Sequence, residues 1–332
     1  MNVVWFWTLA AMLGAYAVLD GYDLGVGAMH VFLARSDTER RVQLNAIGPL
    51  WNGNEVWLIA AGGMMVIAFP RVYAAAFSGF YLALIVVLWL LVVRGVAIEF
   101  RGQIRHPLWS AFWDAGFWLA SLLLALLLGV ALGNLVRGLP VDASGYFRGS
   151  FTLMLSPYAM LVGLLSAVVL AWHGCNFIRG RAQGAQRVRA ERWSRALWWP
   201  ALGLSLAATA LSALQQPGMF DNFRHFPPAL ALPAAAVAGF ALAWGAGRRA
   251  FTGSVLVIGG LLGSAAVTLF PALLRSTVSP AYSLTIYNAS SSPLAQRAAW
   301  IANAAALVAV VAYSVYIHRR FAGPVRLDEH SY

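Results

Sequence analysis

The chain has 332 residues, of which 61% are hydrophobic and only 11% are charged, and its formal net charge is +11. Soluble domains carry about 25% charged residues, so this composition excludes an ordinary soluble protein. Apolar runs long enough to cross a bilayer recur from end to end, which predicts an all-α, polytopic membrane protein. The single cysteine, Cys175, excludes an internal disulfide and a cysteine metal cluster.

The apolar runs predict nine membrane spans. In chain order they cover residues 4–33, 55–69, 73–98, 115–136, 155–178, 197–214, 228–246, 252–274 and 298–317. The second is short unless it extends back through Trp51, and Pro70 suits the turn before the third because proline disrupts a helix interior. The connections are short, so we expect one transmembrane domain over 1–332, with approximate halves 1–150 and 151–332. We expect the longest outer connection, 275–297, to fold over the bundle.

Arginine positions predict the orientation of the spans. All 23 basic residues are arginines. Sixteen of them, Arg248 included, lie in alternate connections and the C-terminal tail, six lie in the other connections, and Arg94 lies within the third span. Cytoplasmic loops are the arginine-rich ones, so the N-terminus is predicted outside and the C-terminus in the cytoplasm. Topology and anionic lipid then account for the net charge, and nucleic acid is not needed as a partner.

Acidic side chains gather in the predicted cytoplasmic half of the membrane. Ionisable groups within spans are costly and usually mark ion or proton routes, so the pattern predicts a polar route for protons from the cytoplasm. The alternative is an interfacial role, in which Glu99 and Asp114 cap helix ends and the side chain of Arg94 extends to the membrane interface. The residues are Asp20 and Asp23, three apart on one face of the first span, then Glu55, Arg94, Glu99 and Asp114.

Residues 50–57 read Leu-Trp-Asn-Gly-Asn-Glu-Val-Trp and place polar side chains at the start of an apolar span. Such side chains usually face protein or water rather than lipid. The tryptophans Trp51 and Trp57 are candidates for packing against a partner or a flat cofactor. An interfacial aromatic belt is the alternative and is favoured for Trp57.

The histidines argue against a haem held by this chain. A bis-histidine haem needs two histidines facing each other at mid-membrane depth, and the spans supply no such pair. His173, near the inner end of the fifth span, is predicted to be a hydrogen-bonded bundle histidine. Methionine ligation stays open, although methionine in a span ordinarily serves packing. We expect no metal site.

Four segments resemble subunit II of the cytochrome bd-type quinol oxidases, including the cyanide-insensitive branch. They are residues 20–27 (DGYDLGVG), 37–41 (DTERR), 51–58 (WNGNEVWL) and 75–81 (AAFSGFY). Gly133-Asn134, 269–271 (LFP) and 287–290 (YNAS) are also similar, so the resemblance runs from end to end.

The resemblance implies a heterodimeric terminal oxidase of the bacterial inner membrane, which oxidises quinol and reduces dioxygen to water with protons from the cytoplasm. Subunit I of that family carries the quinol site and the haems, either haem b with haem d or haem b alone. Subunit II has two four-helix bundles plus a peripheral helix, ligates no haem and lines part of a proton path. A structural quinone in this subunit, lipids and a small single-helix third subunit are further implied partners.

One position departs from the family pattern. Family members usually have Asp where this chain has Asn52, and the resemblance assigns that carboxylate to proton delivery. Asparagine cannot carry a proton by ionising, so Asn52 is not predicted to be a carrier. Two alternatives stay open: either Glu55 with Asp20 and Asp23 takes over, or protons pass mainly through subunit I.

These observations lead to a set of predicted sites. The proton path is predicted at Asp20, Asp23, Glu55 and Glu99, with Arg94 offsetting their charge. Contact with subunit I, close to its haems, is predicted at Trp51, Asn52, Asn54 and Trp57. The competing functions are a proton-coupled secondary transporter, for which intramembrane acids are also natural, and a purely structural subunit.

Overall fold

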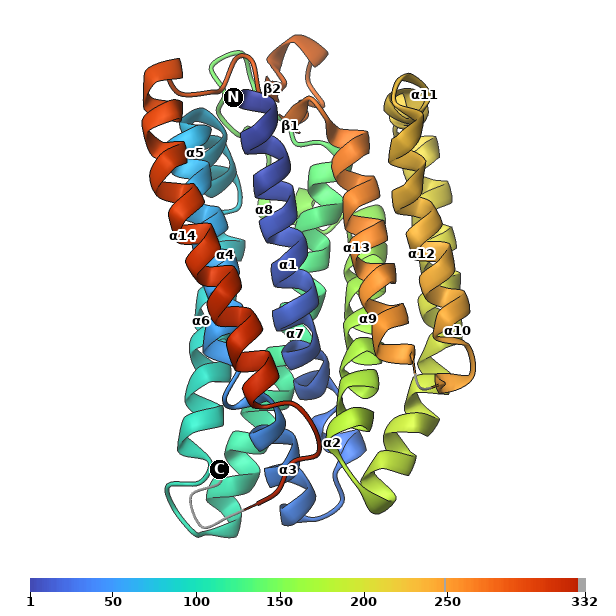
Figure 1. The fold of residues 1–332 in the computed structure, drawn as a ribbon. Helices are drawn as coiled ribbons and strands as arrows, with labels where there is room; N and C mark the ends of the chain where they lie inside the picture. The colour runs from blue at the N-terminus through green and yellow to red at the C-terminus, as the bar shows by residue number, and fades with distance from the viewer. Residues whose placement is uncertain (248, 328–332) are drawn as a thin grey trace.

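Long helices run side by side along one axis in the computed structural model, which describes residues 1–247 and 249–327 (Figure 1). Arg248, one of the arginines counted for orientation, lies outside the described residues. Helices satisfy their own backbone hydrogen bonds, which a lipid environment requires. The long ones are α1 (Asn2–Ala28), α4 (Trp51–Ala68), α6 (Tyr81–Phe100), α7 (Pro107–Arg137), α9 (Pro157–Arg181), α10 (Gly184–Gln215), α12 (Ala231–Leu242), α13 (Ala250–Leu269) and α14 (Pro293–Arg320).

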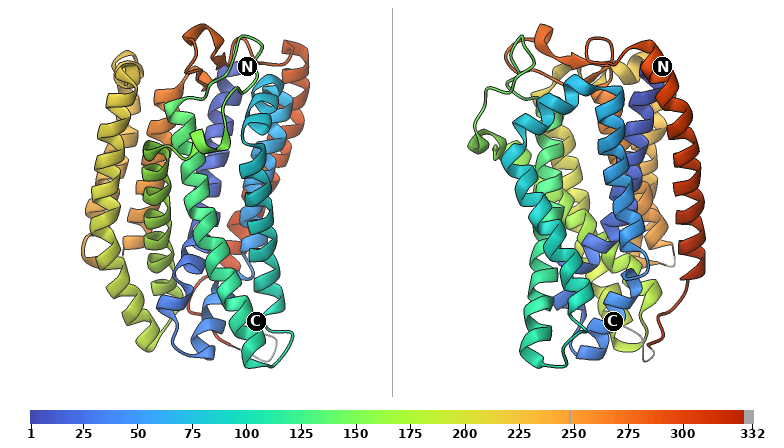
Figure 2. Two further views of the ribbon diagram at one scale, coloured as in Figure 1. Left: turned by 180° about the vertical axis from the view of Figure 1, so that it is seen from behind. Right: turned by 90° about the vertical axis from the view of Figure 1, so that its left-hand side faces the viewer.

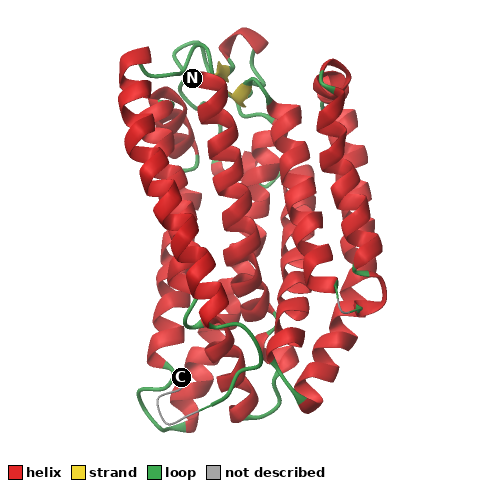
Figure 3. Cartoon of the chain, in the orientation of Figure 1, coloured by secondary structure: helices red, strands yellow, loops and turns green. Residues whose placement is uncertain are grey.

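Short elements join the long helices. They are α2 (His30–Leu33), α3 (Asp37–Ile47), α5 (Pro70–Gly79), α8 (Phe151–Met154), α11 (Asp221–His225) and the 3-10 turns η1 (Pro217–Phe220), η2 (Pro227–Leu230), η3 (Trp244–Ala246) and η4 (Pro280–Tyr282). Two strands, β1 (Ala272–Leu274) and β2 (Leu284–Thr285), pair antiparallel beside the N-terminus (Figure 3).

Among the described residues, seven helices are long and apolar enough to span a membrane, namely α1, α6, α7, α9, α10, α13 and α14. An eighth span is formed if Gly218–His225 and Pro227–Leu242, bent by 115° at their junction, count as one. Helix α4 packs between α1 and α14 but opens with polar residues. The all-α polytopic class is therefore confirmed, and the count of nine stays a prediction.

The long helices form two groups. Helices α1, α4, α6 and α7 pack together, and α9 packs with α10 and α13, which in turn packs with α12. The seam between the groups is made by α1 and α7 against α9, while α14 lies along α4 at the margin (Figures 1 and 2). This arrangement agrees with two four-helix bundles and one peripheral helix.

Glycines set the distance between the two groups at the seam. A Cβ added to Gly25 of α1 would lie 1.9 Å from the carbonyl oxygen of Leu170, and one added to Gly174 of α9 would lie 2.2 Å from the carbonyl carbon of Gly25. The two backbones are therefore in contact, as small residues allow in membrane helix pairs. This contact fixes α1, which carries Asp20 and Asp23, against α9.

Several predicted span boundaries are wrong in the first half. The first span, predicted over 4–33, ends at Ala28, because the chain bends at Met29 before α2. The third, predicted as one helix over 73–98, is divided into α5 and α6 at Phe80. Pro70 does lie at the turn, as the first residue of α5. The fourth starts at Pro107 instead of 115, where the His106 side chain accepts a bond from the Leu108 N–H and proline suits the first helical position.

The second half contains two further differences. The sixth span, predicted over 197–214, begins at Gly184, because the basic segment before the apolar run is also helical. The eighth, predicted over 252–274, ends at Leu269, and the following residues form β1. Apolar composition alone cannot separate a buried strand from the end of a buried helix.

The connection 275–297 folds over one end of the bundle, as predicted. Ser291 N donates to the carbonyl of Ala68 at 3.0 Å, Arg71 Nη1 to that of Asn288 at 2.8 Å, and Asn2 Nδ2 to that of Ile286 at 2.6 Å. The N-terminus lies at this end, and α14 ends near the opposite end, beside α2 and α3 (Figure 1). The orientation of these ends in a membrane stays a prediction.

Candidate functional site

A buried arginine joins three helices of the first group. Arg94 of α6 donates from Nη1 to Asp20 Oδ1 of α1 at 2.8 Å and from Nη2 to Glu55 Oε1 of α4 at 2.5 Å. The side chains of Arg94 and Asp20 are fully buried, whereas that of Glu55 is 21% exposed. The planar guanidinium fork suits two carboxylates at once. Glu55 is thus the member of this site nearest to the surface of the chain.

Asp23 belongs to the same site but is held by an amide. Asn54 Nδ2 of α4 donates to Asp23 Oδ2 at 2.7 Å. The Asp23 side chain is buried, and within the described residues the ion pairs of this site run to Arg94 alone. We call Asp20, Asp23, Asn54, Glu55 and Arg94 the acid cluster.

Several polar atoms of the acid cluster are buried without a hydrogen-bond partner among the described residues. They include Asp20 Oδ2, Asp23 Oδ1 and Arg94 Nε, and Trp51 Nε1 is in the same position. Buried polar groups are paired in the great majority of cases, so a gathering of unpaired atoms calls for a physical explanation, and a functional site is one such explanation. Two of these atoms are carboxylate oxygens on one face of α1, three residues apart.

The residues of segment 50–57 that were predicted to contact a partner subunit are not all exposed. Trp51 is buried, and its ring packs against Gly95 of α6. Trp57 is also buried and donates from Nε1 to Ser314 Oγ of α14 at 3.4 Å, so its alternative assignment to an interfacial belt is wrong. Asn54 is buried as a member of the acid cluster, and Asn52 is exposed. A role in partner contact stays a prediction for these residues and is most direct for Asn52.

Glu99, the remaining predicted proton-path residue, is half-buried on α6. It lies five residues beyond Arg94, which is about 7.5 Å further along the helix axis. This position is nearer to the end that carries α2 and α3 than the acid cluster is. Its assignment to the proton path stays a prediction.

A second chain of hydrogen bonds links the acid cluster to α14. Asn54 Nδ2 donates to the Tyr22 hydroxyl at 2.7 Å, and that hydroxyl lies 2.8 Å from His318 Nε2. His318 Nδ1 lies 2.7 Å from the carbonyl of Ser314, which can only accept, so Nε2 is left to accept the Tyr22 proton. Sequence analysis missed this link, because the bonded groups are 296 residues apart.

A second buried ionic network lies at the end of the bundle that carries α2 and α3. Asp114 of α7 accepts from Arg101 Nε at 2.5 Å, from Arg40 Nη1 at 2.8 Å and bonds His30 Nε2 at 2.9 Å. Arg101 also donates to Asp37 Oδ1 at 2.7 Å. The alternative that Asp114 caps a helix is wrong, because α7 begins about two turns earlier. The network ties α2 and α3 to α6 and α7.

Two groups outside the spans have shifted pKa values. Burial lowers the pKa of the Arg101 guanidinium, but bonds to Asp114 and Asp37 outweigh it and raise that pKa overall. Burial raises the pKa of the Glu39 carboxyl, but bonds from the Arg35 N–H and the Arg189 side chain outweigh it and lower that pKa overall. Both groups therefore stay charged near neutral pH, which keeps this end of the bundle tied by ion pairs.

Three histidines inside or beside the helix groups do not fit a haem. His173 lies 3.0 Å by Nε2 from the carbonyl of Val18 and 2.7 Å by Nδ1 from Ser254 Oγ, as expected for a hydrogen-bonded bundle histidine. His30 and His318 likewise have both ring nitrogens bonded within the chain. The described residues contain no group of three or more His, Cys, Asp or Glu placed to hold a metal ion.

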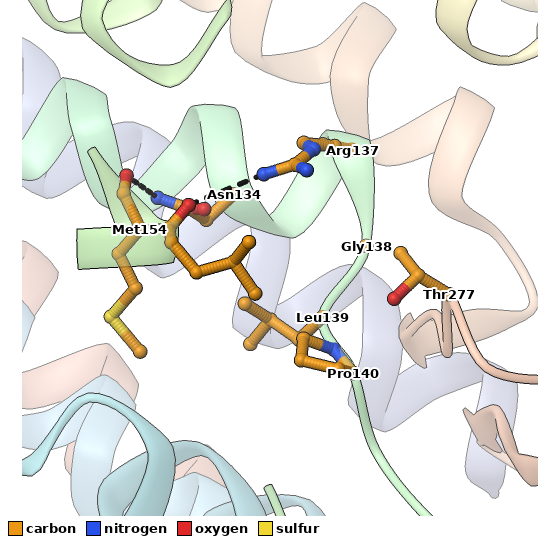
Figure 4. A pocket seen from close by; sticks show the side chains of 8 residues that line it. Asn134, Arg137, Gly138, Leu139, Pro140, Met154 and Thr277 are labelled. Carbon is orange, nitrogen blue, oxygen red and sulfur yellow. Dashed lines mark hydrogen bonds between the residues drawn. The ribbon is translucent and has the colours of Figure 1, made fainter. Parts of the chain in front are cut away.

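A small pocket lies where α7 ends, beneath the connection 275–297 (Figure 4). Its volume is about 10 Å³, enough for roughly one water and not for a quinone ring. Asn134 donates from Nδ2 to the carbonyl of Met154 at 2.8 Å, and Arg137 Nη1 to that of Leu153 at 3.3 Å. Asn134 thus fixes the start of the second helix group, which is a structural role.

Comparison with known proteins gives consistent matches. The profile of the family described as cytochrome bd terminal oxidase subunit II matches residues 1–321. Cytochrome bd-I ubiquinol oxidase subunit 2 of Escherichia coli is 33% identical, covering 91% of this chain and 89% of that protein. Cytochrome bd ubiquinol oxidase subunit 2 of Bacillus subtilis is 34% identical, covering 96% of each.

A probable cytochrome oxidase subunit 2 of Haemophilus influenzae is 32% identical over 99% of this chain and 95% of its own length. The solved structure of bd oxidase from Geobacillus thermodenitrificans has the same fold, with a TM-score of 0.73 at 20% identity over 96% of this chain and 98% of that one. None of these proteins is a transporter, so the competing transporter function gains no support.

Proposed function

This chain belongs to the family of cytochrome bd terminal oxidase subunit II, and we propose that it is the subunit without haem in an enzyme that oxidises quinol and reduces dioxygen to water. The match over residues 1–321 carries this proposal. The chain supplies a helical scaffold, and subunit I is its partner in a multi-pass assembly of the bacterial inner membrane.

The haems of this oxidase are assigned to subunit I. In the described part of this chain, the ring nitrogens of His30, His173 and His318 are all engaged in internal hydrogen bonds. An axial histidine needs a free nitrogen directed at the iron, so these residues do not fit that role. The hydrogen bonds of the histidines do not bear on methionine ligation, which the sequence leaves open. A small third subunit and a structural quinone remain parts of the same proposal.

The acid cluster is proposed to take protons from the cytoplasmic side for the reduction of dioxygen. Glu55 is partly exposed and accepts from Arg94, so it can receive a proton from outside the chain and pass charge toward a buried site. Arg94 pairs with Asp20 inside the bundle, which places a carboxyl behind Glu55. Asp23 belongs to the same site and accepts a hydrogen bond from the amide of Asn54, without an ion pair to a cation of the described residues. Glu99 extends the route toward the cytoplasm.

Purification of the tagged chain from its host tests the assignment. We expect a haem-rich partner to copurify, a reduced-minus-oxidised spectrum with haem bands, and quinol-dependent uptake of oxygen by the complex. The spectrum also decides between haem b with haem d and haem b alone. A functional chain without a partner, or accumulation of a solute by this chain alone in vesicles, would contradict the proposal.

A further inference from the structure

The acid cluster contains more negative groups than its single arginine can balance. Asp20, Asp23 and Glu55 would carry three negative charges, against one positive charge on Arg94. Within the described residues, Arg94 forms ion pairs with Asp20 and with Glu55. Asp23 is thus the carboxyl of the cluster without a cation, and its side chain is buried. A buried carboxyl without a cation neutralises itself by binding a proton.

The unpaired oxygens show where such a proton would bind. Asp23 Oδ2 accepts from Asn54, which leaves Oδ1 buried and without a partner among the described residues. Asp20 Oδ1 accepts from Arg94, and its Oδ2 is buried without a close hydrogen bond, with the buried Tyr16 hydroxyl beside this carboxyl. A proton on Asp23 Oδ1 would let that atom donate toward Asp20 Oδ2, beside the hydroxyl of Tyr16. The two residues lie on one face of α1, within reach of one another.

The groups around Asp23 reinforce its neutral form. The titratable or charged side chains around the Asp20 and Asp23 pair are Tyr16 and Tyr22 of α1, Glu55 of α4, Arg94 of α6, His173 and Arg181 of α9 and His318 of α14. Arg94 is already paired twice, and Tyr22 donates toward His318 and not toward Asp23. The remaining acids repel a second negative charge at Asp23.

We propose that Asp20 and Asp23 form a resident proton-binding site, in which one proton, bonded to Asp23, is shared with Asp20 while the oxidase is at rest. This inference deepens the proposed proton role of the acid cluster and rests on it for its purpose. The resting occupancy itself follows from charge and geometry, so it can be tested apart from turnover. In use, Asp23 gives up this proton and is reprotonated from the side of Glu55.

Infrared spectroscopy of the purified oxidase complex tests the proposal, because a protonated carboxyl has a carbonyl stretching band that a carboxylate lacks. The sample is held at about pH 8, far above the ordinary aspartate pKa of about 3.9. We expect a band that moves on exchange into D₂O, is lost in Asp23→Asn and shifts or disappears in Asp20→Asn. Asp142→Asn is the matched control, since that carboxyl lies in an exposed ion pair with Arg148, and its band is expected to be unchanged.

A wild-type complex without this band, or a band unaltered in Asp23→Asn, would overturn the proposal. The melting temperature of each variant complex then distinguishes loss of the proton from failed assembly of the complex. Asparagine has the shape of a neutral aspartic acid, so Asp23→Asn is expected to melt within about 4 °C of the wild-type complex. A large loss of stability in Asp23→Asn beside a stable Asp20→Asn would make Asp23 the ionised partner of Arg94. If the band behaves as expected while turnover is unchanged, the proton site stands and the proton-supply role fails.

Discussion

Arg94 and Asp20 form an ion pair of 2.8 Å in which both side chains are fully buried. Such a pair is weak evidence for stability, since removing two charges from water costs several kcal/mol per ion. The pair becomes costly to break, however, because either partner alone is left as an uncompensated charge. The pair is joined to the partly exposed Glu55, and the three residues tie three helices together at one point.

Replacing Arg94 by glutamine should prevent assembly of a stable complex. The change leaves Asp20 and Glu55 without a cation, which costs about 3–5 kcal/mol for a buried pair. Thermal unfolding of the purified complex, followed by gel filtration, measures the loss. Arg148→Gln is the control, because Arg148 forms an exposed pair with Asp142 and its removal should change little. Equal stability of the two variants would show that the buried pair is not needed.

Gly25→Ala should separate the two helix groups. Its Cβ would lie 1.9 Å from a backbone oxygen of α9, and a backbone atom cannot turn aside as a side chain does. We expect little assembled complex and a clear drop in melting temperature. Gly14→Ala on the same helix meets nothing within 4 Å, so it should be tolerated. If Gly14→Ala lowered the melting temperature as much as Gly25→Ala, backbone flexibility of glycine and not close helix packing would explain the effect.

Asp114→Asn should loosen the end of the bundle that carries α2 and α3. Arg40, Arg101 and His30 all bond this carboxyl, and its removal leaves the buried Arg101 with only the exposed Asp37 as an acidic partner, at a cost of up to about 3–5 kcal/mol. Limited proteolysis of the 34–50 segment measures the change. Asp37→Asn removes a carboxyl that is 69% exposed from the same network and should have a much smaller effect. Equal cleavage in both variants would assign no special role to Asp114.

The sequence predicts the helical class, the arginine asymmetry and the gathering of acids at one depth, because all three depend on local composition. It does not predict which acid pairs with Arg94, since that depends on how α1, α4 and α6 face one another. The links from Asn54 to Asp23 and from Tyr22 to His318 were missed for the same reason. The bend at Met29 and the division at Phe80 were missed because the apolar run continues through both.

Asn52 supplies a test of the alternative proton routes. Its side chain is exposed on α4, so Asn52→Asp should fold normally. If the acid cluster and the position of Asn52 serve the same route, Asn52→Asp should restore at least part of the turnover lost in Glu55→Gln. The double variant is compared with each single variant in quinol-dependent oxygen uptake. Full activity of Glu55→Gln, unchanged in the double variant, would place the route in subunit I.

Oxygen uptake by the Glu55→Gln complex tests the proposed proton role most directly. Glutamine preserves the shape of Glu55 and its bond to Arg94 but cannot bind and release a proton. We expect turnover with excess quinol to fall by about tenfold or more, as for loss of a proton-transferring group, with the haem spectrum unchanged. Glu191→Gln, which removes a carboxyl paired with Arg187 outside the acid cluster, should keep wild-type turnover. Wild-type turnover in Glu55→Gln, with a normal haem spectrum, would contradict a role for this cluster in proton supply.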